Sequence, residues 1–224
     1  MEFQKGMDIS GLPELEASGA EIKDFDGTVK DAFDLIKEYG VNSVRLRLWN
    51  NPENVKEANG YCDYAHTLAM AKRIKAHGMS FMLDFHYSDF WADPGQQNKP
   101  LAWKDLSFEK LKEAVFTFTK ETLSGLKAEG VLPDVVQIGN EIRSGLLFPD
   151  GELPDYKQMV QLVNAGIKGA RAVADAGEMQ VMIHLDQGGR YFYLKEWFEK
   201  SFEAGLDDFD LIGLSYYCLL YTSD

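Results

Sequence analysis

The chain is poor in cysteine, poor in basic residues and without a long apolar run. Cys62 and Cys218 are its two cysteines among 224 residues, too few and too isolated for a disulfide framework or a metal cluster. The 36 acidic residues outnumber 23 basic ones, and the formal net charge of −13 argues against nucleic acid, an anionic membrane or a polyanionic substrate as partner. No segment approaches the roughly 20 apolar residues of a membrane span. The net charge does not exclude a neutral ligand.

What the chain does have is 45% apolar and 12% aromatic residues, enough for one large domain with a packed core. Short β-branched and apolar runs predict six strands, separated by segments with apolar residues at helical spacing. The predicted strands are Phe3–Ile9, Asn42–Trp49, Met79–His86, Asp134–Asn140, Gln180–Asp186 and Asp210–Tyr217. The predicted helices cover residues 29–40, 63–78, 107–130, 155–177 and 191–204. This alternation predicts an α/β fold with parallel strands and right-handed crossovers.

Polar and aromatic residues are concentrated after the predicted strands, whereas the segments before the strands are plain turns. The polar segments are residues 49–52, 86–94, 141–149 and 184–189. A (β/α)8-barrel, or TIM barrel, carries its chemistry at the carboxyl ends of its strands, so this asymmetry favours that fold. A doubly wound sheet would instead need a glycine-rich phosphate loop after its first strand, and residues 8–15 contain none.

The most informative pair of residues is Asn140-Glu141, which ends the buried-strand pattern formed by Val135, Val136 and Ile138. A carboxyl group at the end of a parallel barrel strand can protonate a leaving oxygen, while the amide beside it holds a sugar hydroxyl. The alternative is a rim glutamate that only pairs with a nearby arginine. We predict Glu141 as a catalytic acid.

The second predicted strand separates apolar from basic residues. Val44, Leu46 and Leu48 lie on one face, and Arg45 and Arg47 on the other. In a barrel the apolar face packs on the helices, so both guanidinium groups point inward and need carboxylate partners. One interpretation is an ion-pair network that only fills the barrel. The functional interpretation is that Arg45 orients a catalytic carboxylate and keeps it ionised.

Two further strands carry an acid and a histidine on one face. Asp84 and His86 share a face of the third strand, and His184 and Asp186 share a face of the fifth. These side chains either build the site or support the barrel. Zinc is a competing use, but the chain has neither a His-x-x-x-His helix nor a close histidine pair.

Trp91 lies in a predicted loop after the third strand, two residues beyond Asp89. Aromatic side chains on rim loops stack on sugar rings, and flanking carboxylates bind the hydroxyls. The alternative is a tryptophan that packs over the barrel mouth.

Six strand-associated segments, in order between about residue 5 and residue 217, carry a family resemblance. They are Lys5-Gly-Met-Asp-Ile-Ser10, Val44-Arg-Leu-Arg-Leu-Trp49, Asp84-Phe-His-Tyr-Ser-Asp89 with Trp91-Ala-Asp-Pro94, Gly139-Asn-Glu-Ile142, Met182-Ile-His-Leu-Asp186 and Gly213-Leu-Ser-Tyr-Tyr217. Together they resemble glycoside hydrolase family 53, the arabinogalactan endo-β-1,4-galactanases.

The resemblance implies a retaining (β/α)8-barrel glycosidase that cleaves the β-1,4-galactan side chains of pectin. It implies that Glu141 is the general acid/base, Asn140 the amide beside it and Arg45 the arginine near the nucleophile. The expected substrate-binding residues are Asp84, His86, Asp89, Trp91, His184, Asp186 and Tyr216. The implied partner is β-1,4-galactan or galacto-oligosaccharides, with no cofactor, and the family's calcium site would lie beyond strand seven. A full-length form would be secreted or periplasmic, although residues 1–5 show no signal segment.

The sequence also departs from the family. Retaining hydrolysis needs a second carboxylate about 5–5.5 Å from the first, which the family places at the end of strand seven. Only about six of the eight βα units are recognisable, and a complete barrel would need roughly 80 more residues. We therefore expect residues 1–217 to be an incomplete catalytic barrel, residues 218–224 a divergent tail, and the chain alone to be inactive.

Three further expectations follow from an incomplete barrel. The open strand edges would be free to pair, so the chain could self-associate. A different class of function is a non-catalytic carbohydrate-binding remnant that uses Trp91 and the polar rim. Another barrel hydrolase, such as a β-mannanase or cellulase, also fits the Asn140-Glu141 pair.

Overall fold

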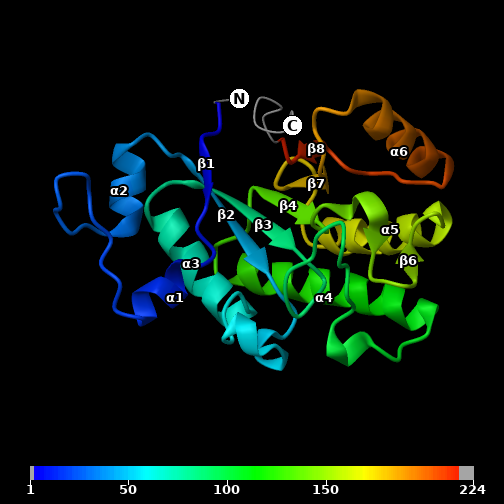
Figure 1. The fold of residues 1–224 in the computed structure, drawn as a ribbon, viewed down its shortest axis with the longest axis horizontal. Coiled ribbons are helices and arrows are strands. Elements are labelled where there is room, and N and C mark those ends of the chain that lie inside the picture. Colours follow the sequence, from blue (N-terminus) through cyan, green and yellow to red (C-terminus); the bar gives the residue numbers. More distant parts are fainter. Residues whose placement is uncertain (1–2, 217–224) are drawn as a thin grey trace, which may run out of the picture.

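A computed structural model describes residues 3–216. Its main sheet has six parallel strands in the order β1-β2-β3-β4-β7-β8, curled into a half-barrel (Figure 1). The strands are β1 Gly6–Asp8, β2 Ser43–Leu48, β3 Ser80–Phe85, β4 Val135–Ile138, β7 Gln180–Leu185 and β8 Leu211–Leu214. Every predicted strand exists and the predicted TIM-barrel architecture is confirmed, with six strands in the main sheet of the described residues.

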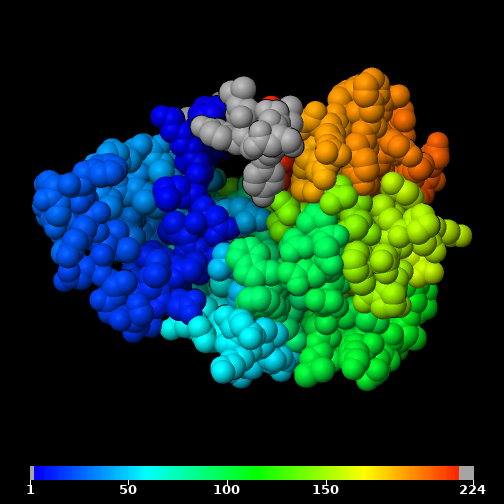
Figure 2. Space-filling view, viewed as in Figure 1, coloured from blue at the N-terminus to red at the C-terminus, as the bar shows by residue number. Residues whose placement is uncertain are grey.

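Helices follow the strands as in βα units. They are α1 Leu12–Ala17, α2 Ala32–Glu38, α3 Tyr64–Ala76, α4 Phe108–Ala128, α5 Tyr156–Arg171 and α6 Tyr191–Glu203. In the view of Figure 1, α1–α3 lie toward the left and α5 and α6 toward the right. The space-filling view shows the blue N-terminal units and the orange α6 region at opposite sides of this face (Figure 2). Short 3₁₀ turns cover Pro52–Asn54, Lys56–Ala58, Leu101–Trp103 and Ile142–Ser144.

Local capping explains where several helices begin. Asp31 accepts hydrogen bonds from the first turn of α2, and Asp63 and Asp155 do the same for α3 and α5. Ser107 precedes α4 as predicted, but its side chain makes no capping bond. These caps satisfy backbone N–H groups that have no partner inside the helix.

The structure corrects several predicted boundaries. Val29 was placed on the first predicted helix, residues 29–40, but α2 begins at Ala32, and Val29 pairs with Lys23 in an isolated bridge. α5 ends at Arg171 rather than near Gly177, and β1 is shorter than predicted. The sequence patterns did not reveal α1, nor the hairpin of β5 Gly145–Leu146 and β6 Gly151–Glu152.

The core lies between the sheet and its helices. Val44, Leu46 and Leu48 of β2 are at most 2% exposed, and Val136 and Ile138 of β4 are fully buried. Burying such a side chain contributes about 1.5–3 kcal/mol relative to leaving it in water. Because side chains alternate along a strand, this outward packing turns the polar residues of each strand to the concave side.

The outer strands β1 and β8 form the two edges of the sheet within the described residues. Met7 on β1 and Ile212 and Leu214 on β8 are each more than 40% exposed. The expected divergent tail, residues 218–224, and Tyr217 lie outside the described residues.

Candidate active site

Arg45 is the centre of a polar network on the concave side of the sheet. Its guanidinium donates to Asp8 Oδ2 and Asp84 Oδ2, both at 2.6 Å, and to Asn140 Oδ1 at 2.9 Å. It also lies 3.3–3.4 Å from Gln137 Oε1. Parallel register produces this cluster, since Asp8 pairs with Arg45 and Asp84 with Gln137 across neighbouring strands. The prediction that Arg45 points inward among carboxylates is confirmed.

The ion pair between Arg45 and Asp84 holds both groups charged. Burial opposes the charge on Arg45, but the Asp84 and Asp8 carboxylates outweigh it and raise the pKa of the guanidinium. Burial would likewise raise the pKa of Asp84, but the Arg45 charge, together with His86, lowers it below the ordinary value. Asp84 is fully buried, whereas the Arg45 side chain is 25% exposed, so the carboxylate end of the pair is shielded from solvent.

His86 is fixed in one tautomer behind this pair. Its Nδ1 accepts hydrogen bonds from Trp49 Nε1 at 3.3 Å and from the Ala92 amide at 3.0 Å. The proton of a neutral ring must therefore be on Nε2, which lies 2.8 Å from Asp84 Oδ2. The ring is 1% exposed and acts as a support for Asp84.

Glu141 lies at the end of β4 in a left-handed backbone conformation, with φ 50° and ψ 48°. The residue two positions before it, Gly139, has φ 79°, and a Cβ there would meet Ile142 Cγ2 at 2.6 Å. Tyr87 after β3 and Gln187 after β7 also have positive φ. Such backbone is costly for residues other than glycine and is concentrated at functional sites. Three strands of the sheet thus end in a strained turn at one rim.

The side chain and backbone of Glu141 are held by residues of β7 and the end of β8. Ser215 Oγ donates to Glu141 Oε1 and lies 3.1 Å from His184 Nε2. The Glu141 amide lies 3.3 Å from His184 Nδ1. Burial lowers the pKa of His184 from 6.5 to about 4, against the smaller opposing effect of the Asp84 charge. A neutral imidazole and a hydroxyl therefore position the carboxylate.

An exposed tryptophan flanks the network. Trp91 is 41% exposed, and the Arg47 guanidinium lies 4.3 Å from its ring centroid. Trp49 packs against the same indole edge to face with ring centroids 6.0 Å apart, and the tilted His86 ring packs against it at 5.7 Å. The ring is therefore held in place while a large part of its surface stays open to a ligand.

The chain is similar to known proteins along nearly its whole length. The family model of glycosyl hydrolase family 53 matches residues 4–223. The chain belongs to glycosyl hydrolase family 53.

Individual members of family 53 are similar along nearly the whole chain. The endo-beta-1,4-galactanase of Bacillus subtilis is 38% identical over 96% of this chain. The protein named "Probable arabinogalactan endo-beta-1,4-galactanase A" of Aspergillus terreus is 39% identical over 95% of this chain. The solved GH53 catalytic domain of Ignisphaera aggregans superposes with a TM-score of 0.88 at 38% identity, over 96% of this chain. The chain spans 49% and 61% of the two relatives and 59% of the solved chain.

The structure changes the expected role of three family 53 site residues. Asp84 and His86 are buried and hold Arg45 and each other rather than facing a ligand. Asp89 is 7% exposed, and it accepts from the Asn51 and Leu101 amides and the Asn54 side chain. Its carboxylate therefore ties loops together. We assign all three to positioning rather than to substrate contact.

The other predicted residues lie along the rim. Asn140 is 7% exposed, and its Nδ2 donates to the Ala92 carbonyl at 2.7 Å, so one of its two N–H groups is already used. Asp186 accepts from Arg143 Nε at 2.8 and 3.0 Å. Tyr216 is 64% exposed. Direct contact of Trp91, Asp186 and Tyr216 with a sugar stays a prediction.

Two site residues were missed from the sequence. Gln137 is 1% exposed and donates to Asp84 Oδ1 at 2.6 Å, and its signal was a polar residue at an inward position of an apolar strand. Ser215 lies within a quoted family segment, but no spacing along the chain links it to Glu141, which is 74 residues away.

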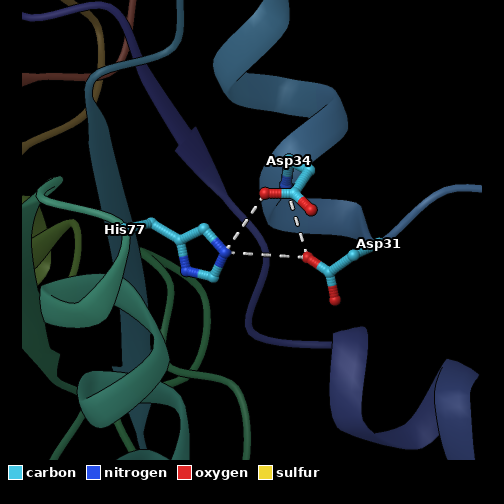
Figure 3. A group of neighbouring side chains, drawn as sticks. All are labelled: Asp31, Asp34 and His77. Carbon is cyan, nitrogen blue, oxygen red and sulfur yellow. Dashed lines mark hydrogen bonds and ion pairs between the residues drawn. The ribbon is translucent and has the colours of Figure 1, made fainter.

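One cluster outside the site has the residue types of a metal centre. Asp31, Asp34 and His77 converge where α2 begins and α3 ends (Figure 3). Asp31 already accepts from two amides of α2 and from Arg73 at 3.1 Å. Helix capping and ion pairing account for the group, and we assign no metal to it.

No helix among residues 3–216 is long and apolar enough to cross a membrane.

Proposed function

We propose that this chain carries the acid/base half of a retaining endo-β-1,4-galactanase site. The observation that supports the proposal best is Glu141, placed on a strained turn at the end of β4 and hydrogen-bonded to Ser215. Asn140 beside it is fixed by Arg45, and Trp91, in the loop after β3, is 41% exposed. A carboxyl held in this way can exchange a proton with a glycosidic oxygen while an aromatic ring holds the sugar.

In the proposed mechanism Glu141 protonates the glycosidic oxygen as the bond to the anomeric carbon breaks. A second carboxylate attacks that carbon, and Glu141 then removes a proton from the water that releases the sugar. We place the second carboxylate beyond the six strands of the main sheet, in the part of the relatives that this chain does not span. The chain by itself then binds galactan without hydrolysing it.

A neutral galactan is supported by the names of the relatives and by charge. A chain of net charge −13 repels polyanions but has no such effect on a neutral polymer. Because galactan is a cell-wall polysaccharide, we also propose that the full-length protein acts outside the cytoplasm.

A test of the mechanism replaces the second carboxylate with azide. With an aryl β-1,4-galactobioside, azide would attack the anomeric carbon as the aryl oxygen leaves with the proton of Glu141. We expect α-galactobiosyl azide from this chain, and slow or no formation of this product with Glu141→Gln. Glu152→Gln, at an exposed position of β6, is the matched control.

The outcomes of this test separate the alternatives. Binding of galactan without azide product would show a carbohydrate-binding remnant and end the catalytic proposal. Galactan hydrolysis without azide would show that the chain supplies its own second carboxylate. Binding of mannan or cellulose in place of galactan would point to another barrel hydrolase.

We also propose that the chain self-associates through β1 and β8. Unpaired N–H and C=O groups at a sheet edge can pair with another chain, and exposed apolar residues on both strands add contact area. Sedimentation velocity at increasing concentration should show a dimer or larger species. A monomer at every concentration would contradict this proposal.

A further inference from the structure

His184 has two possible partners at one ring nitrogen. Its Nδ1 lies 3.3 Å from the backbone amide of Glu141, a donor, and 3.1 Å from Asn140 Oδ1. Oδ1 can only accept, because the amide group is oriented by Nδ2, which donates to the Ala92 carbonyl, and by Arg45, which donates to Oδ1. A bare Nδ1 therefore binds the Glu141 amide, and a protonated Nδ1 binds Asn140.

Ser215 presents the same choice at the other end of the ring. Its hydroxyl lies between Glu141 Oε1 and His184 Nε2, and it has one proton to donate. If the proton is donated to Glu141, Nε2 must carry a proton and donate to the serine oxygen. If it is donated to Nε2, the hydrogen bond to Glu141 requires a protonated carboxyl.

Two complete arrangements follow. With Glu141 ionised, the direction is His184 Nε2–H to Ser215 and Ser215 O–H to Glu141, and Nδ1 accepts from the Glu141 amide. With Glu141 protonated, the direction is Glu141 O–H to Ser215 and Ser215 O–H to Nε2, and Nδ1–H donates to Asn140. The second arrangement holds one more proton than the first. That proton is on Glu141, and the imidazole is neutral in both.

We propose that Ser215 and His184 are positioning residues whose hydrogen bonds reverse direction each time Glu141 gains or loses its proton. The proposal rests on the acid/base role of Glu141. Retaining hydrolysis makes one carboxyl give a proton in the first step and take one in the second. The network keeps the Glu141 carboxyl and the Ser215 hydroxyl hydrogen-bonded in both states, and only the Glu141 backbone amide loses its acceptor when Nδ1 carries the proton.

The charges around His184 keep the ring itself out of the titration. Two of the groups that face the ring are Asp84 of β3 and His86 just after that strand. The other two are Arg45 of β2 and Asp186 just after β7. Burial outweighs the two carboxylates and lowers the pKa of His184 to about 4. The ring therefore changes tautomer rather than charge above that pH.

The test is the tautomer of His184, read by long-range ¹⁵N–¹H NMR of the ¹⁵N-histidine-labelled chain at pH 7. We expect the proton on Nε2 in the parent chain and on Nδ1 in Glu141→Gln, whose amide N–H replaces the carboxyl proton. His86 is an internal control, because two donors at its Nδ1 keep its proton on Nε2 in both. Identical His184 tautomers in the two proteins would overturn the proposal.

Variants of Ser215 test the link itself. Ser215→Ala should abolish the difference that Glu141→Gln makes at His184, and Ser215→Thr, which keeps the hydroxyl, should restore it. A difference in the His184 tautomer that persists in Ser215→Ala would also overturn the proposal. None of these spectra depends on galactan. If the hydrogen bonds of Ser215 and His184 reverse in a chain that forms no glycosyl azide, the proposal about these two residues stands and only the proposed function is refuted.

Discussion

The ion pair between Arg45 and the buried Asp84 makes the sharpest prediction about stability. Arg45→Met keeps most of the apolar stem but leaves Asp84, which is fully buried, without its main counter-charge. Breaking a buried ion pair by removing one partner costs about 3–5 kcal/mol. We therefore expect the free energy of unfolding to fall by about that amount.

Arg47 is a matched control two residues along the same strand and on the same face. Its guanidinium is 3.7 Å from Asp8 and stacks on Trp91 at 4.3 Å, a contact that contributes about 0.5–1 kcal/mol at a partly exposed site. Arg47→Met should therefore destabilise by about 1 kcal/mol.

The assay is urea unfolding at pH 7, with a fixed concentration of trimethylamine N-oxide so that every variant begins folded. Asp84→Asn, alone and combined with Arg45→Met, completes a double-mutant cycle. The coupling energy should be about 2 kcal/mol or more, since the double variant leaves no buried charge unpaired. Equal losses for the two arginine variants, or additivity within about 0.5 kcal/mol, would refute this account of the network.

Three further predictions concern single residues. Burial lowers the pKa of His184 from 6.5 to about 4, so the folded chain binds fewer protons than the unfolded one in this window. The contribution of His184 to the free energy of unfolding is therefore complete above pH 6.5 and is lost as the pH falls toward 4, by about 3 kcal/mol at most. In urea unfolding, His184→Gln should make the free energy of unfolding less dependent on pH in this window. Gly139→Ala should cost about 2–4 kcal/mol because of its positive φ and the contact with Ile142. Gly11→Ala, with open space around it, should cost less than about 0.5 kcal/mol in the same assay. Trp91→Ala should weaken galactan binding about 3–10-fold in affinity electrophoresis, whereas Phe25→Ala, 95% exposed and far along the sequence, should not, and equal effects would contradict a stacking role.

Local patterns were sufficient to predict the frame of the molecule. Alternation in β2 placed Arg45 and Arg47 on the concave side, and the apolar run before Asn140 placed Glu141 at a strand end. These predictions succeeded because the side-chain period of a strand is a property of the backbone alone. The missed helix α1 has only six residues, too few to show a period.

The roles of individual side chains were decided by tertiary structure. Asp89 had the sequence context of a ligand-binding carboxylate, but two donors from the β2–α3 connection and the Leu101 amide of its own β3–α4 connection occupy it. Its partners lie 12 to 38 residues away, and no periodic pattern encodes such contacts.

The sequence by itself determined which residues stand at the ends of the strands, because spacing along one strand fixes the face on which each side chain lies. Only the folded sheet decided that Ser215 and His184 meet Glu141. Parallel strands bring their carboxyl ends to one rim whatever the length of chain between them, and the hydrogen bonds made there depend on register and ring orientation.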